Sequence, residues 1–257
     1  MKSKIIFLTL FFIITEIHES IPLFSESTGK EQSQQRLIIK GVLTWVNTLR
    51  VKHQLIPLRQ SILLQKTAAK YAKEMVKTHT LSHTDSNGNR ALERYREMGG
   101  SALRVGEIIG VGGNILPIEN AWLKSPIHRK VILDPKWTEI GIGYAEYREE
   151  IILDVLFSEN YIVNLRITES RDKVTISGGF EEAIIEKIVK PIMINGLYPV
   201  KPSTWGEKHG FFSFTIPKNK IDRYNVFIRL GYQDKRGQII ITNIIENLHL
   251  LKERNAK

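Results

Sequence analysis

The stretch SPIHRKVILDPKWTEIGIG, residues 125–143, contains two of four short patches on which the fold assignment of the N-terminal half rests. The other two are LSHT at residues 81–84 and GEI at residues 106–108. His83, Glu107 and His128 each lie at the edge of an expected helix or strand. Because loops that follow separate rigid elements can converge on one cleft, these patches predict a shared site built from distant parts of the chain.

Length and composition favour two globular domains and argue against a nucleic-acid partner. The chain has 257 residues, more than the about 100–200 residues of an average domain. Hydrophobic residues make up 42% and charged residues 25%, which is typical of a globular protein. The net charge of +10 is spread along the chain, and no stretch resembles a recognition helix or a base-stacking platform. We therefore expect a solvated basic surface.

The N-terminus is typical of an export signal. Lys2 and Lys4 precede an apolar run over residues 5–14, and polar residues follow to residue 20. We predict a signal peptide over residues 1–20, because ten apolar residues are short for a membrane span. No A-x-A-like cleavage site follows, so an uncleaved segment that tethers the protein to a membrane is the alternative. Both interpretations predict a secreted or cell-envelope protein. The lack of cysteine excludes disulfides and thiol chemistry.

The middle of the chain reads as an α+β domain over residues 37–160, after a polar linker over residues 21–36. Apolar residues recur at steps of three and four in several segments, which predicts helices. These helices are expected over residues 36–49, 61–78 and 90–98, with a fourth from about residue 117. A glycine-rich, flexible stretch is expected after Glu107. Two apolar strands, residues 136–144 and 151–157, are expected to form a hairpin.

The remainder of the chain predicts a small, all-β, sandwich-like domain over residues 161–251. About six short apolar segments alternate there with turn residues such as Gly178-Gly179 and Asn195-Gly196. Residues 181–189 are a candidate short helix. Residues 252–257 are expected to be a frayed tail.

The three polar residues of the patches suit a metal, but their spacing alone does not establish one. Neutral imidazoles and a carboxylate are ligands for zinc or another divalent cation. The intervals of 24 and 21 residues match no local metal signature. The alternative is structural: His83 braces its loop, Glu107 accepts backbone N–H groups, and His128 packs beside Trp122.

In their order along the chain, the patches resemble the bacterial branch of the CAP superfamily. This is the SCP-like domain shared by cysteine-rich secretory proteins, antigen 5 and plant pathogenesis-related proteins. The resemblance covers residues from about 37 to 160. The supporting positions outside the three candidate residues are Asn47, Arg50, Ala121-Trp122 and the segment TEIGIG at residues 138–143.

The resemblance implies an α-β-α sandwich with a central cleft that can hold a divalent cation. His83 and Glu107 match the first histidine and the GEN-type glutamate of the family, and His128 matches the histidine of the bacterial SPGHR-like motif. Glu139 is a weaker fourth candidate. The usual asparagine after the glutamate is Ile108 in this chain.

Three functions remain open from the sequence. The first is an exported, non-enzymatic protein that binds a lipid, an envelope component or a host protein through the His/Glu cleft. The second is a metal-assisted hydrolase that uses a histidine as general base and Glu107 to orient it or to hold a metal-bound water. The third is a structural module. A serine triad at Ser125 is set aside, because no orienting acid or oxyanion donors can be identified.

Overall fold

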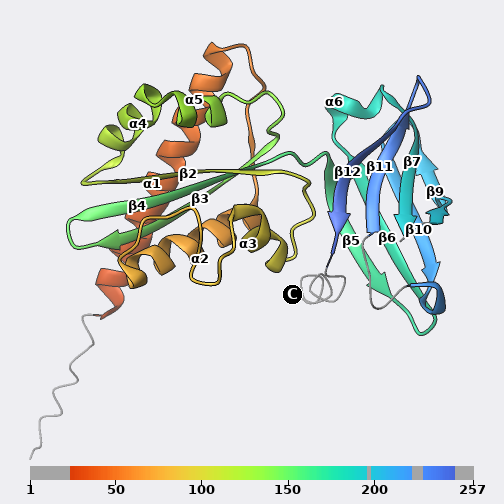
Figure 1. Cartoon of the computed structure of the whole chain (residues 1–257), viewed down its shortest axis with the longest axis horizontal. Coiled ribbons are helices and arrows are strands. Elements are labelled where there is room, and N and C mark those ends of the chain that lie inside the picture. Colours follow the sequence, from red (N-terminus) through yellow and green to blue (C-terminus); the bar gives the residue numbers. More distant parts are fainter. Residues whose placement is uncertain (1–23, 196–197, 222–227, 247–257) are drawn as a thin grey trace, which may run out of the picture.

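The computed structural model describes residues 24–195, 198–221 and 228–246. Helices surround one sheet in the N-terminal part, and the C-terminal part consists of two further sheets (Figure 1). The expected signal peptide over residues 1–20 and the expected tail over residues 252–257 lie outside the described residues. Within the described residues, no helix is both long enough and apolar enough to cross a membrane.

The N-terminal sheet has four strands in the order β1-β3-β4-β2. They are β1 (Arg59–Gln60), β2 (Val105–Gly112), β3 (Glu139–Tyr147) and β4 (Glu150–Ser158). The predicted hairpin is confirmed, because β3 and β4 pair antiparallel with Tyr147 opposite Glu150. β2 pairs antiparallel with the other edge of β4, and β1 pairs parallel with β3.

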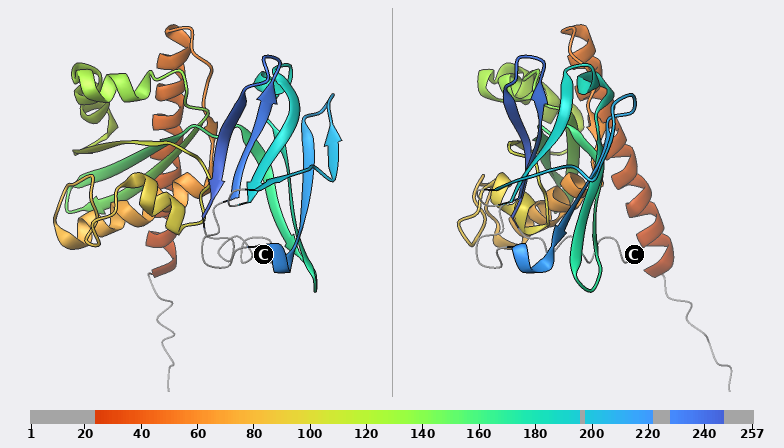
Figure 2. Two further views of the ribbon diagram at one scale, coloured as in Figure 1. Left: turned by 45° about the vertical axis from the view of Figure 1, so that its right-hand side comes forward. Right: turned by 90° about the vertical axis from the view of Figure 1, so that its right-hand side faces the viewer.

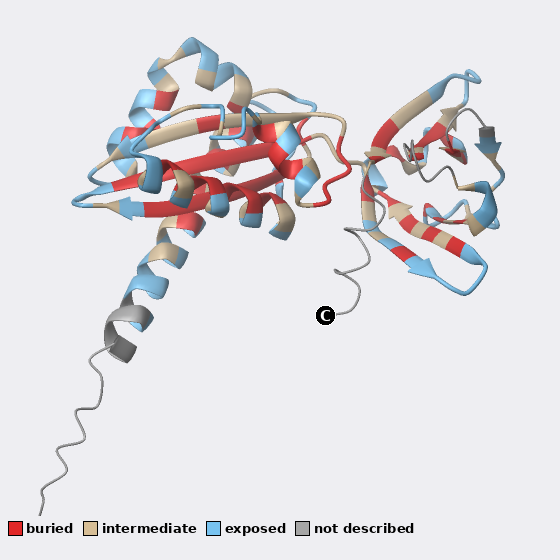
Figure 3. Cartoon of the chain, turned by 60° about the horizontal axis from the view of Figure 1, so that its bottom comes forward, coloured by how far each residue is buried: buried red, intermediate tan, exposed pale blue. Residues whose placement is uncertain are grey.

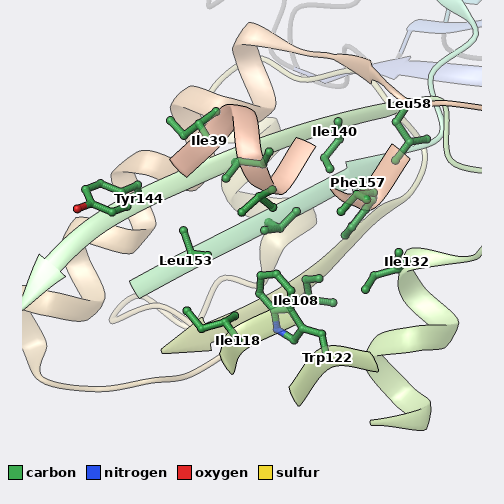
Figure 4. Packing of buried hydrophobic residues seen from close by; sticks show 14 of the residues in the cluster. Ile39, Leu58, Ile108, Ile118, Trp122, Ile132, Ile140, Tyr144, Leu153 and Phe157 are labelled. Carbon is green, nitrogen blue, oxygen red and sulfur yellow. The ribbon is translucent and has the colours of Figure 1, made fainter. Parts of the chain in front are cut away.

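Helices cover both faces of this sheet. The helices are α1 (Phe24–Lys52), α2 (Ile62–Thr78), α3 (Ala91–Glu97), α4 (Ile115–Lys124) and α5 (Pro126–Ile132). One face packs against α1, α4 and α5 in a core that includes Ile39, Trp122 and Phe157 (Figure 4). The opposite face packs against α2 and α3, with Leu64 and Leu156 buried between them. The expected α-β-α sandwich is therefore confirmed.

Two glycines of β3 allow α2 to approach the sheet very closely. A Cβ atom at Gly141 would lie 2.3 Å from the backbone of α2 at Gln65, and one at Gly143 would lie 2.2 Å from that of Ala68. Such distances leave no space for any side chain. The alternation of isoleucine and glycine in β3 thus packs large residues on the α1 face and admits the α2 backbone on the other.

Arg50 holds α1 to the segment that leads into β3. Its side chain is fully buried, and its guanidinium donates to the carbonyl oxygens of Ile56 at 3.1 Å, Ile132 at 2.8 Å and Asp134 at 2.9 Å. A buried charge is tolerated when its donors are satisfied in this way.

Two local expectations are wrong. Residues 24–36 continue α1 rather than forming the expected linker, because Glu and Gln are good helix formers. The stretch after Glu107 is strand β2 rather than a flexible segment. The glycines of that strand make room for aromatic rings: a Cβ at Gly106 would lie 2.7 Å from Trp137, and one at Gly110 would lie 2.8 Å from Trp122.

The C-terminal part is a β-sandwich of two four-stranded sheets, ordered β5-β6-β10-β9 and β12-β11-β7-β8 (Figure 2). Its elements are β5 (Ile162–Glu169), β6 (Lys173–Phe180), α6 (Glu182–Ile185), β7 (Ile188–Asn195), β8 (Tyr198–Val200), β9 (Thr204–Gly206), β10 (Phe211–Pro217), the 3-10 turn η1 (Lys218–Lys220), β11 (Ile228–Asp234) and β12 (Ile239–Ile245). The expected all-β class is confirmed. Sequence patterns miss β8 and β9 because three residues are too few to show alternation.

The two parts have separate hydrophobic cores. The buried cluster of the N-terminal part extends to Phe157, and that of the C-terminal part begins at Ile162 (Figure 3). The boundary between residues 160 and 161 stays a prediction that this separation supports.

Candidate functional site

His83 and Glu107 lie in direct contact, although 24 residues separate them. His83 is in the loop after α2, and Glu107 is near the start of β2. The distance from His83 Nδ1 to Glu107 Oε2 is 2.6 Å. The imidazole side chain is 53% exposed whereas the carboxylate side chain is 5% exposed. Two of the three predicted site residues therefore meet, with the histidine at the surface and the carboxylate beneath it.

Arg94 is a site residue that the sequence reasoning missed. It donates to the second carboxylate oxygen of Glu107, and also to the carbonyl oxygens of His83 at 3.2 Å and Asn89 at 2.8 Å. Its guanidinium lies over the ring of Tyr71, 3.6 Å from the centroid. The available signal was its place on the buried face of α3, three residues after Ala91.

Tyr71 holds the loop that carries His83. Its hydroxyl donates to the carbonyl oxygen of Ser82 at 2.6 Å. Burial raises the pKa of Tyr71 to about 12, so the phenol keeps its proton at neutral pH. The loop is thus held by two hydrogen bonds to its main chain, one from Tyr71 to Ser82 and one from Arg94 to His83.

Asp154 lies under Glu107 and is completely buried. In the β2–β4 pairing Glu107 is opposite Leu156, so Asp154 is its diagonal neighbour on the same face. Burial raises the pKa of Asp154 well above its ordinary value, and the charge of Glu107 raises it further. No donor from the described residues reaches either Asp154 oxygen. Burial and the neighbouring Glu107 charge therefore both keep the proton on Asp154.

The sequence carried a signal for Asp154 as well. It is the one charged residue within the apolar strand segment IILDVLF at residues 151–157. A carboxyl inside a strand that is buried on both faces requires a partner.

His128 lies in the short helix α5, on the segment that follows Trp122, and is half-buried. Its Nδ1 atom is buried and has no hydrogen-bond partner from the described residues. Burial lowers the pKa of His128, and the nearby charge of His83 lowers it further. His128 is therefore neutral at physiological pH and lies close enough to His83 for a charge on His83 to lower its pKa.

Glu139 does not join this cluster. It is buried at the start of β3, where it accepts hydrogen bonds from Arg59 at 2.8 Å, Ser158 at 2.8 Å and Asn160 at 3.1 Å. Its carboxylate oxygens are engaged by these three residues, and its role as a fourth ligand stays a prediction.

The three-ligand metal set of His83, Glu107 and His128 stays a prediction. Across residues 24–195, 198–221 and 228–246, no three His, Cys, Asp or Glu side chains are close enough together to hold a metal ion. Both oxygens of Glu107 are engaged, one by Arg94 and the other by His83. A carboxylate that accepts from Nδ1–H of a histidine fixes the tautomer with its lone pair on Nε2. The arrangement can therefore orient His83 toward a ligand.

Comparison with known proteins identifies the family. The profile of the cysteine-rich secretory protein family, CAP, matches residues 43–161. A protein of Borreliella burgdorferi strain B31 is 31% identical over 106 residues, which cover 41% of this chain and 67% of that protein. The chain belongs to the CAP family.

One further relative and one solved structure are similar to part of this CAP chain. YkwD of Bacillus subtilis strain 168 is 32% identical over 108 residues, and the matched region covers 42% of each protein. The chain thus spans less than half the length of that relative. The structure of an outer surface protein from Borrelia burgdorferi is similar over 47% of this chain and 90% of that chain, with 27% identity and a TM-score of 0.45. The residues of the candidate site all lie within the span of the family profile: His83, Arg94, Glu107, His128 and Asp154.

Proposed function

We propose that this CAP protein is exported and binds a ligand, without catalysis, through the surface formed by His83 and His128. Candidate ligands are a lipid, an envelope component or a host protein. Export is supported by the basic residues and apolar run over residues 2–14. An exported chain without cysteine must stay folded by core packing alone, and each of the two parts has a buried hydrophobic core of its own.

The observation that carries the proposal is the double engagement of Glu107. A general base needs a free lone pair within reach of the proton that it removes. Glu107 has an arginine on one oxygen and a histidine on the other, and its side chain is 5% exposed. Glu107 is therefore placed to orient His83 and not to act as the base itself, which supports ligand binding and leaves a histidine base as the hydrolase alternative.

A divalent cation is compatible with this proposal only if it has two protein ligands instead of the predicted three. Two imidazoles, His83 and His128, would supply the protein ligands, and Glu107 would hold His83 in the required tautomer from the outer shell. A bound cation would supply a charged contact for an anionic or carbonyl group of the ligand. Two ligands alone make a weak site.

Zinc titration of the full chain tests the cation. We expect the ring signals of both histidines to shift on addition of Zn²⁺ in the nuclear magnetic resonance spectrum, and His83→Ala or His128→Ala to abolish the shift of the other. Exposed His53→Ala is the matched control and should leave both shifts unchanged. A ring shift of either histidine that persists unchanged in the single variant of the other would overturn the proposed cation contact.

A metal-assisted hydrolase is the second candidate, favoured by the neutral His128 with its buried Nδ1. Hydrolysis of p-nitrophenyl acetate with Zn²⁺ present distinguishes it. Turnover that is lost in Glu107→Gln at unchanged melting temperature would establish the hydrolase and overturn the binding proposal. Hydrolysis no faster than that of a Zn²⁺-containing buffer without protein supports binding.

A further inference from the structure

The chain between Arg94 and Glu107 passes through the contact between the two domains. Its two ends supply both partners of the buried ion pair at the site. Its middle, Ser101 and Ala102, is buried against β12 of the C-terminal domain. A single stretch of chain therefore touches the candidate site at each end and the second domain at its centre.

The contact at the centre is a set of direct hydrogen bonds. Ala102 forms an antiparallel bridge with Asn243, and the Ile244 N–H donates to the Ser101 carbonyl oxygen at 2.7 Å. The Asn243 side chain is fully buried, and its amide nitrogen donates to Ser101 Oγ at 3.0 Å and to Asn160 Oδ1 at 2.9 Å. Asn243 thus ties this stretch of chain to the end of β4.

A second tie involves the helix that carries the site arginine. Arg96, two residues after Arg94 on α3, pairs with Glu246 at 2.6 Å, and both side chains are about one-fifth exposed. Between these arginines, Tyr95 packs so tightly on Gly100 that a Cβ there would lie 2.1 Å from the ring. Seven residues are too short for a helix to be stable without tertiary contacts. The position of α3 therefore depends on what it packs against.

From these contacts we propose that the C-terminal domain sets the geometry of the His83–Glu107–Arg94 cluster, with Asn243 as a positioning residue. Glu107 is held by its pairing with β4, whereas Arg94 depends on α3 and on the chain that follows it. Loss of the Asn243 amide leaves Ser101 Oγ and Asn160 Oδ1 without this donor in a buried site. Ser101 then keeps its main-chain bond to Ile244 but loses its side-chain tie, and this stretch of chain and α3 can shift. The guanidinium of Arg94 moves with α3 relative to Glu107 and to the carbonyl oxygen of His83.

The proposal gives the second domain a role at the site discussed above, and its main test needs no ligand. The His83 ring and Arg94 Nε–H resonances are recorded in the metal-free full chain. We expect Asn243→Ala to shift both. The matched control is Asn195→Ala, which removes a buried amide of the same domain that donates to Lys220 O at 2.9 Å. The control should shift neither resonance, although it also weakens the C-terminal domain.

Glu246→Gln provides a milder variant that retains the buried network. It removes only the charge that pairs with Arg96, and we expect a smaller shift of the same Arg94 resonance. Unchanged His83 and Arg94 resonances in a folded Asn243→Ala protein, or equal shifts in Asn195→Ala, would overturn the proposal. If Asn243→Ala does not fold, the test rests on Glu246→Gln. In that case an unchanged Arg94 resonance in Glu246→Gln overturns the proposal. If Zn²⁺ shifts neither histidine ring but Asn243→Ala shifts the His83 and Arg94 resonances, only the proposed cation contact is overturned.

Discussion

The fully buried carboxyl of Asp154 lies against the carboxylate of Glu107, whose other contacts are Arg94 and His83. Two carboxyl groups at such proximity do not both ionise, so the pair shares one negative charge with the arginine. The exposed histidine thus rests on a buried layer with one Arg⁺, one carboxylate and one neutral carboxyl. This layer determines the responses to mutation and pH predicted below.

Asp154→Asn is expected to stabilise the protein increasingly as the pH rises. Above about pH 4 the unfolded Asp154 ionises, whereas the folded residue keeps its proton because its pKa is raised. The folded wild type then binds more protons, so its free energy of unfolding falls as the pH rises toward the folded pKa. Asparagine has no such proton. Urea unfolding at pH 5 and 7 should show the advantage of Asp154→Asn growing by about 1.4 kcal/mol for each pH unit until that pKa is reached. Exposed Asp172→Asn is the control, and an equally large growth there would contradict the explanation.

Arg94→Met is expected to destabilise the protein by about 3–5 kcal/mol, the usual cost of leaving a buried charge without its partner. Both side chains of the Arg94–Glu107 pair are almost fully buried, so solvent compensates little. Chemical denaturation gives the free energy of unfolding. Exposed Arg129→Met, for which no ion pair is described, should change it by less than about 0.5 kcal/mol. Addition of Glu107→Gln to Arg94→Met should recover part of the loss, because the orphaned charge is then removed.

Gly143→Ala is expected to destabilise the protein by about 3 kcal/mol, because the new methyl group collides with the α2 backbone at Ala68. Gly113→Ala is the matched control, since its Cβ would meet only the Glu149 carbonyl oxygen at 3.9 Å. Thermal unfolding of the two variants measures the difference. Similar melting temperatures would show that α2 can move away from the sheet without cost.

His128 is expected to titrate below the ordinary histidine pKa of about 6.5, because burial and the His83 charge both disfavour its protonated form. The unfolded state then binds more protons near pH 6, so this residue lowers stability as the pH falls below about 6.5. The ring signals of His128 give its pKa directly. In His83→Ala that pKa should rise toward about 6.5 but stay below it, since burial is the larger cause. A pKa at or above about 6.5 in the wild type would show that the ring is solvated.

Sequence patterns predicted the elements whose causes are local. The period of the apolar residues gave α2, and the alternation in two neighbouring segments gave the β3–β4 hairpin. The patches around His83 and Glu107 predicted that these two residues would converge, and they are in contact. Strand β2 was missed, because the local signal of Gly110 and Gly112 is flexibility, and only the packing of Trp122 and Ile118 shows why these residues lack side chains.

The sequence by itself determined the family, the two-domain fold class and the expectation that His83 and Glu107 share a cleft, since order, periodicity and turn residues are properties of the chain. Only the tertiary structure decided the electrostatic environment of the site. Arg94 and Asp154 act through burial and through distances to groups far along the chain, and neither quantity can be read from spacing. The same reason separates Glu139 from the site: its partners Arg59, Ser158 and Asn160 become neighbours only when the sheet forms.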